Sequence, residues 1–159
     1  MKLTKRSLMK HLEDFLKKKN YLKIKLTKIA SNHLELKARI NGVEGSFILD
    51  TGASNSCIDF SLSEKFKLKV EDSDTKAAGA GAIDLETKTS SKNTVKINNW
   101  NYSNFNLVLL DLSHVNTALT EHHAEAVDGI IGADILEKGK AIIDYGSKCL
   151  FLKKLVYKF

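Results

Sequence analysis

The segment Phe47 to Ser54, FILDTGAS, drives a short apolar run into an aspartate and then turns at once. Asp50 is followed by a threonine, a glycine and two small residues, so its carboxylate lies at the junction of a strand-like segment and a tight turn. A carboxylate held in this way is a candidate general acid or base. The structural alternative is a plain turn, since Asp bonds to its own backbone and Gly accepts a positive φ. Asp-Thr-Gly alone does not separate the two interpretations.

A second motif, Ile130-Ile131-Gly132, follows far downstream within DGIIGADIL, Asp128 to Leu136. This stretch predicts a tight turn, a very short apolar strand and a helix of about two turns. An Asp-Gly turn accounts for Asp128 without any chemistry. Ser54 and Ser56 do not form a serine triad with Asp50, because no histidine is placed beside them by a readable motif.

The elements that position Asp50 are predicted to be strands. Apolar residues alternate with polar ones from Leu22 to Leu26 and again from Leu34 to Ile40, which predicts strands with one buried face. Asn41-Gly42 then indicates a tight hairpin. The returning strand is expected at Val43 to Leu49, so Asp50 should lie just past its end.

The remainder of the chain reads as mainly β with short helices. Ser113 is expected to cap its helix, and the turn NNWN should join two strands. The further elements expected are a helical turn over Asp59–Phe66, strands over Thr94–Ile97 and Phe105–Leu110, a helix over Ser113–His122, and a strand pair over Ala141–Asp144 and Cys149–Val156.

Residues 1–20 are expected to form a basic amphipathic helix, and residues 21–159 the main domain. Thr4 or Ser7 should cap the helix, which the periodicity predicts over residues 4–19. Its apolar stripe consists of Leu8, Met9, Leu12, Phe15 and Leu16. The preferred interpretation is a helix packed on its own domain with a solvated lysine face. The alternative is contact with an anionic surface, either a membrane or a nucleic acid.

Length and charge limit the classes of function. The 159 residues suffice for one domain. Residues 1–28 hold ten Lys/Arg and two Asp/Glu, a net charge of +8, whereas residues 29–159 hold fifteen and seventeen, a net charge of −2. The main domain therefore shows no sign of a nucleic-acid face. No apolar run reaches the roughly 20 residues of a membrane span, and no signal peptide is evident, so a cytoplasmic location is expected.

Cysteines and histidines give no sign of a metal site. Cys57 and Cys149 are too few and too far apart in sequence for a disulfide framework, and they are expected to be small buried thiols. His122-His123 is interpreted as an exposed loop pair, because adjacent side chains point in different directions. Neither a metal nor an organic cofactor is expected.

FILDTGAS and the distant IIG together resemble the retropepsin-like aspartic proteases. Val127 to Leu152 is similar to the bacterial single-domain branch of that family in particular. The resemblance covers roughly Leu34 to Leu152 and leaves the basic N-terminal helix outside it. It implies a single-domain acid protease fold, mainly β and built as a closed barrel, with short helices and an extra N-terminal helix.

The resemblance implies an aspartic endopeptidase that acts on an extended peptide or protein. Two carboxylates would share one proton, so that one activates water while the other donates to the peptide carbonyl. Because the chain holds one Asp-Thr-Gly, the second carboxylate should be Asp50 of another copy in a two-fold homodimer. The alternative is a catalytically silent peptide-binding or dimerisation module with the same fold.

The family pattern also assigns roles to the neighbours of Asp50. Thr51 should bond across the dimer axis, and Gly52 should leave room for the substrate and accept its amide hydrogen. Ala53 lies where pepsin-like enzymes usually carry a hydroxyl. Losing that hydroxyl should raise the joint pKa of the two carboxylates and give a pH optimum milder than strongly acidic. Ile130, Ile131 and Gly132 should support the catalytic loop from beneath.

A glycine-bearing hairpin, the flap, is expected to cover the cleft. KAAGAGA lies at a suitable distance after Asp50, with Gly79, Ala80 and Gly81 near the expected tip. The alternative is an ordinary flexible loop. The chain departs from the viral enzymes at Ser54 and Ala133, where those enzymes usually carry an acidic residue and an arginine that pair. Asp134 remains at a helix start, where a carboxylate suits free N–H groups.

Overall fold

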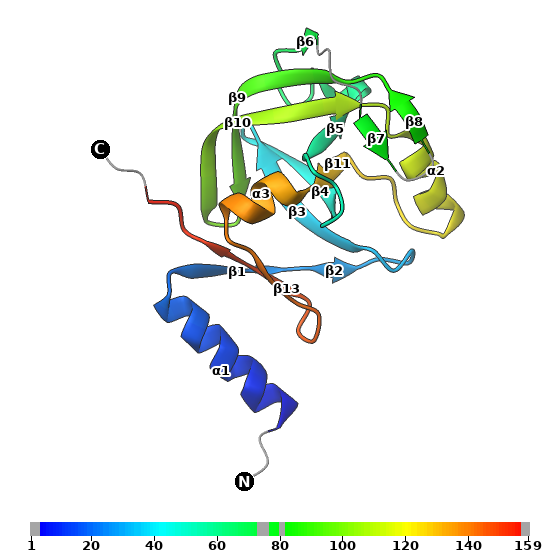
Figure 1. Cartoon of the computed structure of the whole chain (residues 1–159). Coiled ribbons are helices and arrows are strands. Elements are labelled where there is room, and N and C mark those ends of the chain that lie inside the picture. Colours follow the sequence, from blue (N-terminus) through cyan, green and yellow to red (C-terminus); the bar gives the residue numbers. More distant parts are fainter. Residues whose placement is uncertain (1–3, 73–76, 80–81, 157–159) are drawn as a thin grey trace.

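A computed structural model of the chain describes residues 4–72, 77–79 and 82–156 (Figure 1). Strands dominate it, as the sequence predicts, and the helices are short apart from the first. In chain order the elements are α1 Lys5–Lys18, β1 Tyr21–Lys25, β2 Thr27–Lys28, β3 Leu34–Ile40, β4 Val43–Leu49, β5 Cys57–Asp59, the 3-10 turn η1 Phe60–Leu62, β6 Glu71–Asp72, β7 Ala77–Gly79, β8 Ala82–Leu85, β9 Lys88–Ile97, β10 Trp100–Leu110, α2 Ser113–Glu121, β11 Gly129–Ile131, α3 Ala133–Lys138, β12 Ile142–Asp144 and β13 Cys149–Lys153.

The main sheet closes on itself into a barrel. Its strands follow the order β3, β4, β11, β5, β10 and β9, and β9 pairs back onto β3 through Arg39 with Lys96 and Ile40 with Val95. Short β2 and β6 extend the sheet beside β3 and β9. Because closure removes the unpaired edges of these strands, the barrel gives the loops at its ends a rigid base. The predicted closed β barrel is confirmed.

The hairpin at Asn41-Gly42 fixes the register of β3 against β4. Asn41 has φ 50° and Gly42 has φ 83°, the left-handed pair that a two-residue turn of this kind requires. Ile40 then pairs with Val43, and Leu36 with Phe47. Alternate residues of β3 are buried, as its period-two pattern predicts. This register delivers the carboxyl end of β4 to Asp50.

Strands β9 and β10 are longer than the sequence predicts. The expected strands, Thr94–Ile97 and Phe105–Leu110, are only their most apolar parts. Toward the other end of β9 the buried positions are polar, with Ser90 fully buried and Asn93 3% exposed. The Asn93 amide donates to the backbone oxygens of Ser90 and Phe105 at 2.9 and 3.3 Å. A buried polar group that is hydrogen-bonded in this way carries no apolar signal for a strand.

The ends of two other elements differ from prediction. Ser113 does not cap α2. Instead, the Oδ1 of the preceding Asp111 accepts the Ser113 N–H at 2.8 Å, at the start of the helix. The final strand β13 ends at Lys153, short of the predicted Val156, where the Lys154 N–H turns to donate to the Asn20 carbonyl at 2.9 Å.

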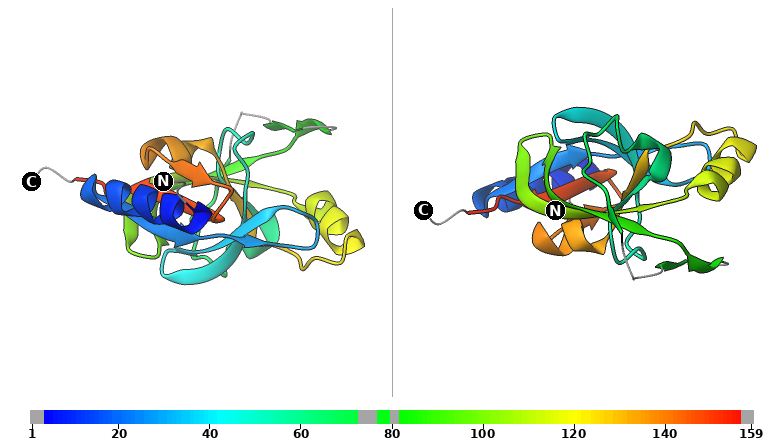
Figure 2. Two further views of the ribbon diagram at one scale, coloured as in Figure 1. Left: turned by 90° about the horizontal axis from the view of Figure 1, so that it is seen from below. Right: turned by 90° about the horizontal axis from the view of Figure 1, so that it is seen from above.

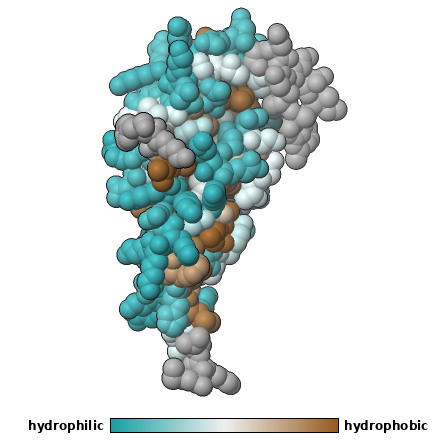
Figure 3. Space-filling view, turned by 60° about the vertical axis from the view of Figure 1, so that its left-hand side comes forward, coloured by the Kyte–Doolittle hydropathy of each residue, from teal (hydrophilic) through white to brown (hydrophobic). Residues whose placement is uncertain are grey.

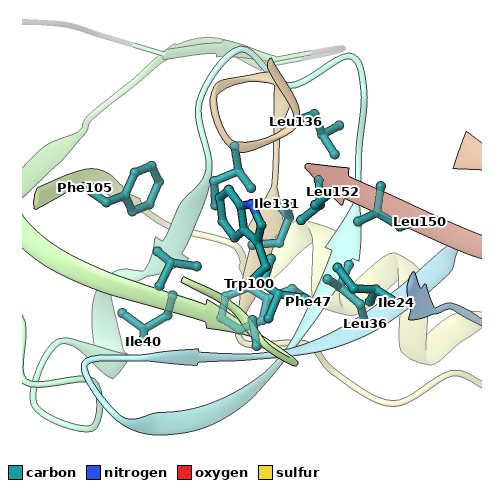
Figure 4. Packing of buried hydrophobic residues seen from close by; sticks show 14 of the residues in the cluster. Ile24, Leu36, Ile40, Phe47, Trp100, Phe105, Ile131, Leu136, Leu150 and Leu152 are labelled. Atoms are coloured by element: carbon teal, nitrogen blue, oxygen red, sulfur yellow. The ribbon is translucent and has the colours of Figure 1, made fainter. Parts of the chain in front are cut away.

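The core fills the barrel and continues beneath it (Figure 4). Trp100, Phe47 and Ile131 are all at most 1% exposed. The Trp100 indole N–H donates to the Lys153 carbonyl at 2.9 Å, which links the barrel to β13. Burial of this apolar surface is the main stabilising term for a barrel of this size.

Below the barrel, β1, β13 and β12 form a separate three-stranded sheet with β13 in the middle. Leu150 and Leu152 of β13 join the barrel core, whereas Cys149 and Phe151 belong to a second cluster with Leu16 of α1. Both faces of β13 are therefore covered, which explains its continuous apolar sequence. Figure 1 shows α1 below this sheet, on the side away from the barrel, with its N-terminal end pointing away from the domain.

Helix α1 begins at its predicted cap, since the Thr4 Oγ1 accepts the Ser7 N–H at 3.1 Å. Its packing differs from the preferred interpretation. Only Leu16 of the apolar stripe is buried, while Leu8, Leu12 and Phe15 are 52%, 36% and 57% exposed. The helix runs past the edge of the domain and leaves these side chains without cover. Among the helices that the structure describes, none is long and apolar enough to cross a membrane.

Candidate active site

The site lies where one strand passes between two others. Strand β11 pairs in parallel with β4 and antiparallel with β5, so it occupies the place between them. The loop from Asp50 to Ser56 leaves the end of β4 and must cross over the end of β11 to reach β5. The two motifs that are about 80 residues apart in sequence therefore meet at one edge of the barrel (Figure 1).

Asp50 is exposed in the single chain, and its orientation is fixed by the backbone. Its N–H donates to the Ile131 carbonyl at 3.0 Å, which continues the β4–β11 pairing by one residue. Its Oδ1 accepts the Gly52 N–H at 2.9 Å. A Cβ at Gly52 would lie 3.3 Å from that oxygen, so a glycine gives the carboxylate room. Thr51 and Gly52 are also exposed, whereas Ala53 is half-buried.

The far side of the loop from Asp50 to Ser56 rests on the start of α3. The Ala133 N–H donates to the Ala53 carbonyl at 2.7 Å. A Cβ at Gly132 would lie 2.6 Å from the same carbonyl oxygen and 3.0 Å from the Asn55 backbone, so no other residue fits here without moving the loop. Gly132 thus lets the loop lie directly on β11 and α3.

A clamp that the sequence analysis missed joins Ser56, Gly132 and Asp134. The Ser56 hydroxyl donates to Asp134 Oδ1 at 2.6 Å, and the Ser56 N–H donates to Oδ2 at 2.9 Å. The same hydroxyl oxygen accepts the Gly132 N–H at 2.8 Å. Ser56 is fully buried. Asp134 at the expected helix start was the available signal, but no local pattern pairs it with Ser56.

Asp128 has a structural role other than the predicted turn. Its Oδ2 accepts the Ser46 N–H at 2.8 Å, and the Lys65 Nζ lies 3.2 Å from its Oδ1. The carboxylate therefore ties the segment before β11 to β4. A Cβ at Gly45 would lie 2.9 Å from the same carboxylate, which explains the glycine in this strand.

Both cysteines are buried free thiols, as predicted. Cys57 lies in β5, beside Ile130 of β11. Burial raises the pKa of the Cys57 thiol to about 12, and the carboxylates of Asp134, Asp50 and Asp59 contribute in the same direction. Cys57 is therefore a neutral packing residue at neutral pH and not a nucleophile.

The expected flap region contains a hairpin. Strands β7 and β8 pair antiparallel, Ala77 with Leu85 and Gly79 with Ala82. Gly79 ends the first strand, while Ala80 and Gly81, at the expected tip, lie outside the described residues. The covering role of this hairpin stays a prediction.

The structure brings the two predicted motifs, Asp50 to Ala53 and Ile130 to Gly132, to one place. Asp50, Thr51, Gly52 and Ala53 form the exposed loop, and Ile130 and Ile131 pair with Ile48 and Leu49 directly before it. Across the portion of the chain that the structure describes, no group of three or more His, Cys, Asp and Glu residues could hold a metal ion.

Comparison with known proteins gives a family. A family model described as aspartyl protease matches residues 36–135, well over half of the chain. No curated protein sequence matches. Many solved structures do.

Three solved structures share the fold. EIAV protease in complex with the inhibitor HBY-793 is 20% identical with a TM-score of 0.53, over 70% of this chain and 92% of that one. The retroviral protease-like domain of Ddi1 from Leishmania major is 20% identical with a TM-score of 0.53, over 77% and 90%. A retropepsin-like aspartic protease from Rickettsia conorii is 17% identical with a TM-score of 0.52, over 84% and 89%.

Proposed function

Because the chain belongs to the aspartyl protease family and adopts the retropepsin-like fold, we propose that it is an aspartic endopeptidase whose active site is completed by a second copy of the chain. The observation that carries this proposal is the position of Asp50. Its carboxylate is exposed on a loop that rests on α3, and the Gly52 N–H orients it. One chain supplies one Asp-Thr-Gly, and the chemistry needs two carboxylates.

A two-fold axis beside Asp50 would bring two identical loops face to face. The exposure of Asp50, Thr51 and Gly52 leaves them free for such a contact. Two carboxylates within hydrogen-bonding distance share one proton, because two adjacent negative charges are costly. Thr51 would bond across the axis and hold the two loops in register. Isologous contact of this kind is the usual geometry of homodimers.

The reaction then follows from the shared proton. The ionised Asp50 accepts a proton from a bound water while the water oxygen forms a bond to the peptide carbonyl carbon. The protonated Asp50 of the other copy donates its proton to the carbonyl oxygen. Breaking the carbon–nitrogen bond transfers a proton to the leaving amine, which gives a carboxyl product and an amine product. The clamp on the loop would keep both carboxylates aimed during these steps.

The β7–β8 hairpin would cover the peptide. An extended substrate can pair its backbone with strand edges, so affinity comes from main-chain bonds and specificity from side-chain pockets. Closure of the hairpin would exclude water other than the nucleophile.

The experiment is a dilution and mixing series. The cleavage rate per chain should rise with the dimer fraction, measured in the same samples by light scattering. Adding an excess of Asp50→Asn chains should lower the rate, since mixed dimers hold one carboxylate of the pair, whereas the same mass of albumin should not. A rate per chain that stays constant while the dimer fraction changes would contradict a shared site.

The second candidate keeps the fold and the dimer without turnover, as a peptide-binding or dimerisation module. The intact Asp-Thr-Gly disfavours it. Pepstatin separates the two, because it should block cleavage by a true dyad. A chain that forms a stable dimer, binds peptides and cleaves none of them would be the module.

A further inference from the structure

Helix α1 carries an apolar stripe that the domain does not cover. Leu8, Leu12 and Phe15 follow one another at helical spacing, and each is at least 36% exposed. Figure 3 shows hydrophobic side chains along the tapering lower part of the molecule, between hydrophilic ones. Isolated exposed apolar residues are ordinary, but three on one helical stripe form a patch of the kind that marks an interaction site.

The helix is held to the domain by its second half. Leu16 packs into the cluster with Cys149 and Phe151, and Glu13 pairs with Lys23 of β1 at 3.0 Å. These contacts place Leu8 and Phe15 on a side turned away from the sheet. The apolar stripe is thus held in place on a fixed helix, and its side chains remain exposed.

The charge around the stripe is strongly positive. The exposed basic residues of α1 are Lys5, Arg6, Lys10, Lys17 and Lys18, and the Lys19 ammonium lies 5.8 Å from the centre of the Phe15 ring. Residues 1–28 carry a net charge of +8 in sequence. A partner must therefore offer both negative charge and apolar surface.

These two requirements decide between the possible partners. A second α1 supplies apolar surface but would bring two strongly positive segments together, which is unfavourable. A nucleic acid supplies negative charge but leaves the apolar stripe in water. A bilayer with anionic lipids supplies both, since an amphipathic helix lies in its interface with apolar side chains inserted and lysines at the headgroups.

We propose that α1 is an interfacial anchor that attaches the protein to anionic lipid surfaces through Leu8, Leu12 and Phe15. Figures 1 and 2 place α1 and the β7–β8 hairpin at opposite ends of the molecule. Attachment through α1 therefore leaves the hairpin end facing the solvent. This proposal does not depend on protease activity.

The test is flotation of the full chain with two sets of vesicles, one of phosphatidylcholine alone and one with about a third phosphatidylglycerol. We expect binding to the anionic vesicles only, weakened by salt. The double variant Leu8→Ser/Phe15→Ser keeps every charge and should reduce the partition coefficient at least about tenfold. Lys10→Gln/Lys17→Gln/Lys18→Gln should weaken binding to the anionic vesicles by about a hundredfold. Val70→Ser, which removes an exposed apolar side chain far from α1 in sequence, is the matched control and should bind like wild type.

Two results would overturn the proposal. One is failure of the wild-type chain to float with anionic vesicles at low salt. The other is unchanged binding by Leu8→Ser/Phe15→Ser with native helical content in its circular dichroism spectrum. Light scattering of the same variant tests whether the stripe contacts a second copy of the chain. A lower dimer fraction without any loss of lipid binding would show that it does, and would also overturn the proposal.

Discussion

The Ser56 hydroxyl lies 2.6 Å from the Asp134 carboxylate, although the two residues are 78 positions apart. This bond joins the end of the loop from Asp50 to Ser56 to the first turn of α3. Asp134 Oδ1 also accepts the Ile135 N–H at 2.8 Å, and Gly132 donates to Ser56. One aspartate thus ties together the two sequence motifs on which the site depends. The viral pattern makes its link with charges at the positions of Ser54 and Ala133, whereas this chain makes a link through Ser56 and Asp134.

Replacing Ser56 with alanine should weaken both the fold and the site. The change leaves the buried Gly132 N–H without its partner and removes one of the two hydrogen bonds that Asp134 Oδ1 accepts. We expect a loss of about 1–3 kcal/mol in the free energy of unfolding. Urea titration followed by fluorescence measures it, since Trp100 is the single tryptophan.

Ser54→Ala is the matched control, because Ser54 is exposed in the same loop. It should change the free energy of unfolding by less than about 0.5 kcal/mol. Equal losses in the two variants would show that the bond between Ser56 and Asp134 contributes nothing specific.

Restoring a hydroxyl at Ala53 should shift the pH dependence of cleavage. A serine there can donate to the ionised carboxylate of the pair and favour the charged form, which lowers the pair's joint pKa. The acidic limb of the rate profile should therefore move to lower pH in Ala53→Ser. The measurement is kcat/KM from pH 4 to 7.5 for both proteins. An acidic limb that stays in place, or moves to higher pH, would contradict this reasoning.

Asp59 should contribute stability that disappears in acid. Burial works to raise the pKa of Asp59, but hydrogen bonds from Ser61 and from the Leu112 N–H outweigh it, so the pKa lies below its ordinary value of 3.8. The contribution is therefore complete above about pH 3.8 and is lost as the pH falls through the lowered pKa. Urea titrations at pH 7, 5, 4 and 3 give the free energy of unfolding of Asp59→Asn and wild type, and the two values should converge at the lowest pH. Asp72→Asn is the control, because Asp72 is an exposed carboxylate on β6. If the free energies of unfolding of Asp59→Asn and wild type differ by the same amount at every pH, Asp59 does not contribute in this way.

Leu16→Ala should loosen α1 and leave the barrel intact. Leu16 is 3% exposed and is the buried residue of the helix, so its truncation should cost about 2–4 kcal/mol of local packing. Hydrogen exchange of the α1 amides should become faster, while the emission of Trp100, 1% exposed in the barrel, stays unchanged. Leu12→Ala on the same helix should alter neither measurement. A shifted Trp100 emission in Leu16→Ala would mean that helix and barrel unfold together.

Local patterns predicted the parts of the fold that depend on local physics. The hairpin at Asn41-Gly42, the end of β4 before Asp50 and the short β11 all follow from turn chemistry and apolar spacing. The polar half of β9 was missed because Ser90 and Asn93 are buried through hydrogen bonds, which leave no apolar period.

The candidate site was predictable at its two motifs and not between them. The proximity of Asp50 to Ile131 depends on the parallel pairing of β4 with β11, a long-range contact with no local signal. Ser56 reads as an ordinary loop serine until Asp134 is placed beside it. The exposure of Leu8 and Phe15 was also hidden, because a helical stripe in sequence does not show whether a domain covers it.

A second copy of Asp50 completes the proposed active site, and a single cleavage assay tests this. Wild type and Asp50→Asn are compared on a diverse peptide library from pH 4 to 7.5, with the dimer fraction measured in the same samples. We expect cleavage by dimeric wild type that pepstatin blocks, and none by an Asp50→Asn protein that still forms dimers. A well-formed wild-type dimer that cleaves no peptide at any pH, or an Asp50→Asn dimer that cleaves as fast as wild type, would contradict it.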